Sequence, residues 1–117
     1  MSMEETIYQR VEEQAMVFSV LADPTRLKLV KLLCHQRYPD ALCVNALAGL
    51  LGVTQSAVSQ HLRVLKSIGL VKGERRGYRI HYHINRDTME HCREQVLAAL
   101  TIEELGSEEE PSHKKRR

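Results

Sequence analysis

The hydrophobic pattern of the chain predicts five helices, in the ranges 1–21, 25–35, 43–51, 54–66 and 86–105. In the first, fourth and last ranges, apolar residues recur at intervals of three and four, which places them on one helical face. The apolar stripes of the first and last helices have no evident packing partner within the chain. The simplest way to bury them is against a second copy of the chain. These two stripes are Ile7, Val11, Ala15 and Phe18, and Met89, Cys92, Val96 and Leu100.

Residues with strong preferences for helix ends mark several boundaries. Asp23 suits an N-cap, and Pro24 suits the start of the helix 25–35, which is apolar nearly all round and is the predicted central core helix. Gly52 suits a helix end, and the Thr54 hydroxyl can accept a hydrogen bond from an unpaired amide of the next helix. Two helices therefore meet across a tight turn. The second one docks on the core through Val58, Leu62 and Leu65.

After Gly69 the helical spacing gives way to an alternation of apolar and polar residues, which is typical of a half-buried strand. The predicted inward positions are Tyr78, Ile80, Tyr82 and Ile84. Residues 70–75 form the predicted partner strand, and Arg75, Arg76 and Gly77 form the connection. A hairpin after a helix-turn-helix is a wing, so the predicted fold class is mainly α with a small β-hairpin, a winged helix-turn-helix. It would dimerise through its first and last helices.

The polar side of the helix 54–66 carries Ser56, Ser59, Gln60 and Arg63, and no Asp or Glu occurs from Ala41 to Gly73. Hydrogen-bonding groups without carboxylates suit the major groove of DNA, because side chains there must reach base edges and phosphate oxygens. The alternative interpretation is a solvated helix face, although such faces usually mix Glu with Lys.

The formal net charge of +2 conceals an uneven distribution. Residues 41–86 contain seven basic residues and one acid, Glu74, whereas residues 87–110 contain eight acids and one base, Arg93. Basic charge is therefore concentrated around the predicted turn and wing, as expected of a protein that binds a phosphate backbone.

A chain of 117 residues accommodates one domain. We assign 1–105 to a winged helix-turn-helix domain for DNA binding and dimerisation, and 106–117 to a disordered charged tail. No apolar run approaches the length of a membrane span and no signal-peptide pattern opens the sequence, which predicts a cytoplasmic protein without a membrane partner. The three cysteines are irregularly spaced, which favours free thiols over a disulfide framework.

Three stretches, FSVLADPTRL (18–27), LCV (42–44) and TQSAVSQHL (54–62), resemble the ArsR/SmtB family of winged-helix repressors. The likeness extends from about Met16 to Leu100. It implies a homodimeric repressor that binds an inverted-repeat operator in double-stranded DNA and leaves it when a metal, metalloid or thiol-reactive inducer binds. Taken together, the candidate DNA-contacting residues are Thr54, Gln55, Ser56, Ser59, Gln60, His61, Arg63, Arg75, Arg76 and Arg79.

The resemblance also indicates where an inducer would act. Metal-sensing members have Cys-x-Cys at the start of the helix before the turn, where Cys43 matches the first cysteine and Asn45 replaces the second. A single thiolate needs further ligands to hold a soft metal ion. Amides at a helix start stabilise a thiolate, so Cys43 is the candidate sensor, with a structural helix-start residue as the alternative. Arg86 and Thr88 stand where other members carry zinc ligands, so that site is not expected.

The remaining cysteines and the histidines give weaker signals. Cys34 and Cys92 do not match the dithiol pattern of redox-sensing members, and we interpret Cys34 as a core residue and Cys92 as a packing residue. His81 and His83 are two positions apart on the predicted exposed face of the strand, a spacing that can chelate a metal, and His91 could lie near them. Surface histidines of a DNA-facing wing are the alternative.

Two other classes of function fit the sequence less well than DNA binding. An enzyme is not predicted, because the sequence has no Gly-rich phosphate loop and no HExxH run. A winged helix that only docks another protein is the alternative function. It predicts apolar or mixed-charge residues on the exposed face of the helix 54–66.

Overall fold

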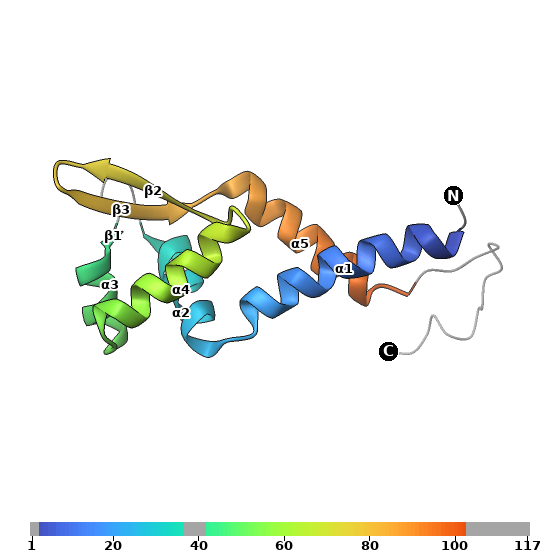
Figure 1. Cartoon of the computed structure of the whole chain (residues 1–117), viewed down its shortest axis with the longest axis horizontal. Coiled ribbons are helices and arrows are strands. Elements are labelled where there is room, and N and C mark those ends of the chain that lie inside the picture. The colour runs from blue at the N-terminus through green and yellow to red at the C-terminus, as the bar shows by residue number, and fades with distance from the viewer. Residues whose placement is uncertain (1–2, 37–41, 103–117) are drawn as a thin grey trace, which may run out of the picture.

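The computed structural model describes residues 3–36 and 42–102, so the predicted tail 106–117 and the central residues of the loop 36–42 lie outside it. Within the described ranges the chain forms five helices and a three-stranded sheet, a winged helix-turn-helix as predicted (Figure 1). None of these helices combines the length and the apolar composition that crossing a lipid bilayer requires. The elements are α1 (Met3–Leu21), α2 (Pro24–His35), β1 (Leu42–Cys43), α3 (Val44–Leu51), α4 (Gln55–Ser67), β2 (Val71–Arg76), β3 (Arg79–Ile84) and α5 (Arg86–Leu100).

The sheet has β3 at its centre, with β1 and β2 antiparallel on either side. The sequence predicted only the hairpin of β2 and β3. β1 was missed because its two residues, Leu42 and Cys43, are too few to show an alternating pattern. Gln36 at the end of α2 holds β1 beside β3: its side-chain amide donates to the carbonyl of Tyr82 at 2.7 Å, and its side-chain oxygen accepts from the N–H of Leu42 at 2.9 Å.

The hairpin turns later than predicted. Arg76 pairs with Arg79, so Arg76 belongs to the strand and the turn consists of Gly77 and Tyr78. Gly77 has a φ of +69°, a left-handed conformation that glycine adopts without a steric cost. Tyr78 was expected to be buried but is 88% exposed, because the tip extends past the helices that cover the sheet (Figure 1). The four predicted inward positions run from exposed at the tip to buried or half-buried near α5, in the order Tyr78, Ile80, Tyr82 and Ile84.

The core lies between α2, α4 and the sheet. α2 begins as predicted, with Asp23 as its N-cap and Pro24 at its first position, and it buries residues on one side. The prediction of a helix buried almost all round is wrong for Leu27, which is exposed. The predicted stripe of α4 is confirmed as buried. The principal core residues of the two helices are Leu29, Val30, Leu33, Val58, Leu62 and Leu65.

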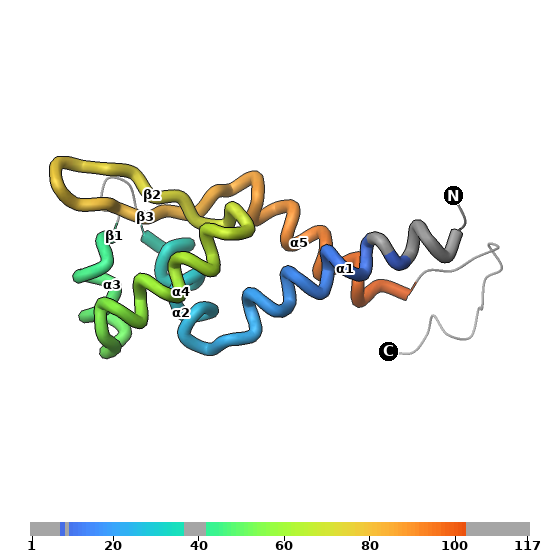
Figure 2. The backbone as a smooth tube through the Cα atoms, viewed as in Figure 1, coloured from blue at the N-terminus to red at the C-terminus, as the bar shows by residue number. Residues whose placement is uncertain are grey.

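α1 and α5 pack against each other within the protomer and extend away from the sheet (Figures 1 and 2). Their buried residues are Gln14, Val17 and Val20 on α1, and Cys92 and Gln95 on α5. In the predicted stripe of α1, Val11, Ala15 and Phe18 are exposed, so these residues have no covering partner within the described protomer, as expected from the sequence. The helix uses a neighbouring face for its contacts with the rest of the chain.

α5 ends at Leu100 instead of near residue 105, since Thr101 has extended backbone angles of φ −93° and ψ 134°. Its predicted stripe begins inside the protomer, where Cys92 is buried and Met89 and Val96 are half-buried. The stripe ends outside it, at the exposed Leu100. The apolar residues at the far end of α5 thus remain available to another surface.

Glu13 on α1 and His91 on α5 link the two helices through an Oε2–Nε2 contact of 2.6 Å. The hydrogen bond to Glu13 and its negative charge raise the pKa of His91 above its usual 6.5. The interaction of Glu13 with protonated His91 stabilises the folded protein fully below about pH 6.5, and this stabilisation is lost as the pH rises through the raised pKa. The free energy of unfolding should therefore fall between about pH 6 and about pH 8, where His91 loses its proton. In the His91→Gln protein we expect a smaller fall over the same range, measured by urea denaturation. Glu13→Gln should act alike, and an unaltered pH dependence in both variants would contradict the expectation.

Candidate nucleic-acid interface

The turn between α3 and α4 has the geometry predicted from its sequence. α3 ends at Gly52, whose φ of +69° is left-handed and whose N–H donates to the carbonyl of Ala48 at 2.9 Å. α4 begins after Thr54, whose Oγ1 accepts a hydrogen bond from the N–H of Ala57 at 3.0 Å. The two helices are thus held in a helix-turn-helix by interactions local to the turn.

The side of α4 that faces away from the core carries the polar residues predicted to contact DNA. Ser56, Ser59, Gln60 and Arg63 are all exposed. α4 presents hydrogen-bond donors and acceptors together with the positive charge of Arg63, and no acidic side chain lies on the helix itself. Such a face can hydrogen-bond to base edges and neutralise phosphates without electrostatic repulsion.

Gln55 is exposed at the start of α4, and its side-chain amide donates to the Oδ1 of Asn45 on α3. Asn45 is the residue that stands at the second position of the Cys-x-Cys pattern. Its side chain therefore joins the starts of the two helices of the motif. The contact gives Asn45 a structural role at the position where a metal-sensing chain would carry a thiolate.

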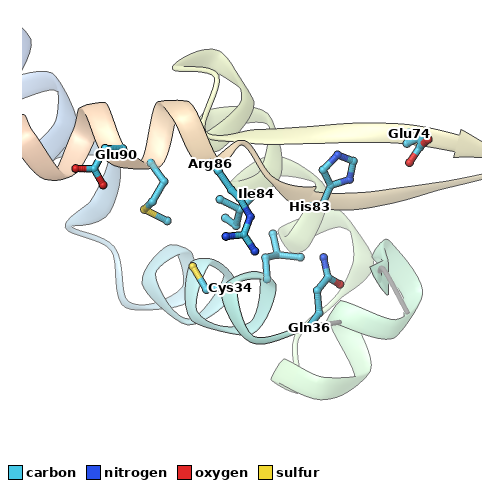
Figure 3. Close-up of a pocket in the computed structure, with 9 residues that line it drawn as sticks. Cys34, Gln36, Glu74, His83, Ile84, Arg86 and Glu90 are labelled. Carbon is cyan, nitrogen blue, oxygen red and sulfur yellow. The ribbon is translucent and has the colours of Figure 1, made fainter. Parts of the chain in front are cut away.

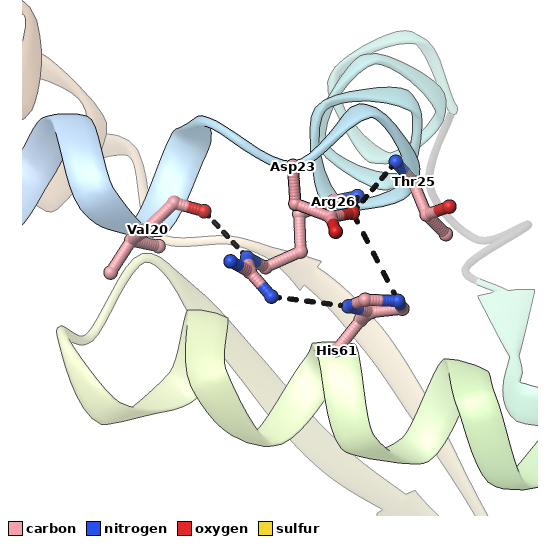
Figure 4. A network of polar contacts seen from close by, with 5 residues as sticks. All are labelled: Val20, Asp23, Thr25, Arg26 and His61. Carbon is pink, nitrogen blue, oxygen red and sulfur yellow. Dashed lines mark hydrogen bonds and ion pairs between the residues drawn. The ribbon is translucent and has the colours of Figure 1, made fainter.

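His61, which the resemblance placed among the DNA-contacting positions, faces the junction of α1 and α2 instead (Figure 4). Its Nδ1 lies 3.2 Å from the Nη1 of Arg26, and its Nε2 lies 4.0 Å from the Oδ1 of Asp23. A guanidinium only donates hydrogen bonds, so Nδ1 acts as the acceptor in this contact. The sequence carried a signal for this position, because His61 stands between Val58 and Leu65 at helical spacing and thus borders the buried stripe.

The same junction is braced by further hydrogen bonds from Asp23 and Arg26. The Arg26 Nε donates to the carbonyl of Val20 at 2.6 Å, and the Asp23 carboxylate accepts from the N–H groups of Thr25 at 2.8 Å and Arg26 at 3.1 Å. The hydrogen bond from the backbone of Arg26 is the largest cause of the lowered pKa of Asp23, and the hydrogen bond from the backbone of Thr25 acts in the same direction. This network, missed in the sequence, connects the end of α1 to α4 and fixes the orientation of α4.

The wing is defined as β2, β3 and their turn, and its turn lies at one end of the molecule (Figure 1). The wing contains several basic residues. Arg75 and Arg79 are exposed. Arg76 is half-buried and donates to the Glu74 carboxylate at 3.3 Å. Because Glu74 offsets the charge of Arg76, Arg75 and Arg79 are the better placed of the three to contact a phosphate backbone.

Cys43 occupies the N-cap position of α3, next to its unpaired amides. A hydrogen bond from the backbone of Ala46 is the largest cause of the lowered pKa of the Cys43 thiol, and the charge of Arg79 acts in the same direction. Cys92 is buried, and burial raises its pKa. Cys34 is exposed, which corrects its interpretation as a core residue.

These environments predict different thiol reactivities. The thiolate is the nucleophile, so the half-buried Cys43 should react with iodoacetamide at neutral pH faster than the buried Cys92, by on the order of tenfold or more. Peptide mapping by mass spectrometry after brief exposure would measure both rates. Denatured protein, in which the two thiols should react alike, is the control. Equal rates in the folded protein would contradict the prediction.

The histidines do not assemble as the metal-site interpretation expected. His81 and His83 are half-buried rather than exposed, and His91 is bound to Glu13 on α1. In the described part of the chain, no group of three or more His, Cys, Asp or Glu side chains is placed to hold a metal ion. Cys43 is paired across the sheet with His81, but these two alone are fewer than the ligands of a tetrahedral site. The donors described here therefore do not fit a metal centre within one protomer.

Comparison with known proteins places this geometry in a family. The model of the bacterial regulatory proteins of the arsR family matches residues 23–72. A transcriptional repressor SmtB homolog of Synechocystis is 43% identical over 75 residues, which cover 64% of this chain and 54% of that protein. An uncharacterized HTH-type transcriptional regulator of Methanocaldococcus jannaschii is 34% identical over 79 residues, covering 68% of this chain and 85% of that protein.

A solved structure shares the fold over nearly the whole length. It is the homodimeric winged helix-turn-helix DNA-binding domain of a possible ArsR-family transcriptional regulator from Mycobacterium bovis. The TM-score is 0.61 at 28% sequence identity, with 93% of this chain and 96% of that chain covered. The helix-turn-helix and wing described above, together with these matches, show that the chain belongs to the ArsR/SmtB family of winged helix-turn-helix transcriptional regulators.

Proposed function

We propose that this protein is a transcriptional repressor that binds an inverted-repeat operator in double-stranded DNA as a homodimer. The observation that carries the proposal is the exposed face of α4, with Ser56, Ser59, Gln60 and Arg63 and no acidic side chain, beside a basic wing. The Synechocystis relative is named a repressor, and the Mycobacterium bovis domain is described as DNA-binding. A protein-docking module would instead favour apolar or mixed-charge residues on this face.

Exposed apolar residues on α1 and α5 support the homodimer. These helices leave Val11, Phe18, Leu97 and Leu100 uncovered in the protomer. A second copy would bury them across a two-fold axis, in an arrangement where the same surface meets itself. The Mycobacterium bovis domain is described as homodimeric. In such a dimer the two α4 helices would enter successive major grooves on one side of the duplex.

Selection from a pool of random duplexes tests the proposal without knowledge of the operator. Repeated binding and amplification should enrich an inverted repeat whose half-sites are about 10 base pairs apart, centre to centre. Titration of the enriched duplex, followed by fluorescence anisotropy and sedimentation, should give two protomers per duplex. A pool that remains random at low salt contradicts DNA recognition, and enrichment of a sequence without two-fold symmetry contradicts the dimer.

The wing cations should act on the phosphate backbone rather than on bases. We expect Arg75→Gln and Arg79→Gln each to weaken binding to all duplexes and to reduce the slope of log affinity against log salt by about 1 per protomer contact. Anisotropy titrations at several salt concentrations measure both effects. Lys31→Gln, which removes an exposed cation from α2, is the matched control. A changed sequence preference with an unchanged salt slope would contradict backbone contact.

We further infer that Cys43 takes part in the release of DNA. Its lowered thiol pKa and its position at the start of the helix before α4 favour a thiol-reactive or metalloid inducer that forms a bond to its sulfur. A screen of arsenite, metal ions and oxidants for release of the enriched duplex would identify active compounds. Cys43→Ser should lose the response and Cys34→Ser should keep it. Normal release of the Cys43→Ser protein by every active compound would exclude this role.

A further inference from the structure

A hollow of about 610 Å³ lies between the end of α2, the sheet and the start of α5, apart from the DNA-facing side of α4 (Figure 3). Its size falls within the range of small-molecule sites in proteins. One part of its lining is apolar, contributed by Leu33, Ile84 and Met89. The other part is polar and includes Cys34, His83 and Arg86. An apolar wall with a few polar groups is the usual composition of a ligand site.

Several polar groups of the hollow are already engaged within the protein. The side-chain nitrogen and oxygen of Gln36 are both hydrogen-bonded, to β3 and β1 respectively. Glu74 accepts a hydrogen bond from Arg76 at 3.3 Å, and Glu90 accepts from Arg93 at 3.4 Å. The two carboxylates are therefore compensated by neighbouring guanidinium groups.

The Arg86 side chain is exposed, and its guanidinium makes no hydrogen bond or ion pair with the residues that the structure describes. Figure 3 shows its side chain directed from the start of α5 toward α2, where Cys34 lies on the opposite side. A guanidinium presents its donors in a planar fork that matches a carboxylate. The start of α5 also carries the partial positive charge of the helix, which adds to the attraction for one anion.

We propose that this hollow binds a small organic acid, with its carboxylate on Arg86 and its apolar body against Leu33, Ile84 and Met89. The proposed site is separate from Cys43, and it brings α2, the wing strands and the dimer helix α5 into contact with one ligand. Occupancy would shift the wing relative to α5 and change DNA affinity, a consequence that rests on the proposed function. Binding of the acid itself does not depend on it.

Binding is tested on the full chain, without DNA, with 2-naphthoate as the probe and 2-naphthamide as its uncharged analogue. Methyl resonances of Leu33, Ile84 and Met89 should shift with 2-naphthoate at millimolar concentration, and alkylation of Cys34 should slow. Arg86→Gln should weaken 2-naphthoate binding by about tenfold or more, because a hydrogen bond to a charged group is lost. Arg10→Gln, which removes an exposed cation on α1, should leave it unchanged.

Three results would overturn the inference: no methyl shifts with 2-naphthoate, equal affinity for 2-naphthamide, or unaltered affinity in folded Arg86→Gln protein. The regulatory consequence is measured separately, as the change in operator affinity when 2-naphthoate is added. An unchanged affinity despite proven occupancy would contradict the regulation. Failure of the unliganded protein to bind DNA would instead contradict the proposed function, and the NMR result would still decide the ligand site.

Discussion

Leu62→Ala is expected to lower the free energy of unfolding by about 2–5 kcal/mol, the cost of removing a large side chain from a packed core. Leu62 is 1% exposed and lies on the buried face of α4, between Val58 and Leu65. The substitution removes apolar contacts and leaves a cavity that the surrounding packed side chains fill only in part. Equilibrium denaturation in guanidinium chloride at one fixed protein concentration measures the effect, since the proposed dimer would make the apparent stability depend on concentration.

The matched control is Leu50→Ala on α3, because the same atoms are removed from a side chain that is 61% exposed. We expect that variant to change the unfolding free energy by less than about 0.5 kcal/mol, as surface substitutions usually do. Equal losses in the two variants would mean that burial in the described protomer does not determine the stability of α4. A loss confined to Leu62→Ala would support α4 as part of the core.

Arg63→Ala should weaken binding to the selected operator by about 1–3 kcal/mol, roughly tenfold to a hundredfold. Arg63 is exposed on the polar face of α4, where a guanidinium can donate two hydrogen bonds to a guanine edge. Its removal should also relax the base preference at one position of each half-site. Anisotropy titrations against operators with single base changes measure both effects.

Two comparisons separate this effect from loss of the fold. Arg63→Ala should keep the unfolding free energy of the parent protein, because the side chain is exposed and alanine favours helix. Lys31→Ala removes an exposed cation from α2 and should leave operator affinity nearly unchanged. If Arg63→Ala and Lys31→Ala bind the operator equally well, the face of α4 assigned here does not contact DNA.

Some elements were predictable because local chemistry alone determines them. Asp23 and Pro24 began α2 as expected, and Gly52 and Thr54 formed the turn before α4. Each of these residues acts through backbone preferences or hydrogen bonds that reach only a few positions along the chain. The buried stripe of α4 was equally clear, because its apolar residues recur at helical spacing and the opposite face of the helix is polar.

Other expectations failed where a contact distant in sequence decided the outcome. His61 lies against Arg26, which is 35 positions away, and so leaves the set of exposed residues on α4. β1 forms because Leu42 and Cys43 pair with β3 as an antiparallel strand. Cys34 lies within an apolar run yet is exposed, and its side chain lines the hollow instead of the core.

The sequence by itself determined the helix-turn-helix, the acid-free polar face of α4 and the concentration of basic residues in the wing, since these follow from periodicity, helix capping and residue type. Only the tertiary structure decided which face of α1 is buried and where the hairpin turns. It also decided that His61 contacts Arg26 and that Arg86 lines the hollow. The physical reason is that burial and pairing depend on which surfaces meet in space. A periodic pattern identifies a surface that can be buried, but it does not identify the element that covers it.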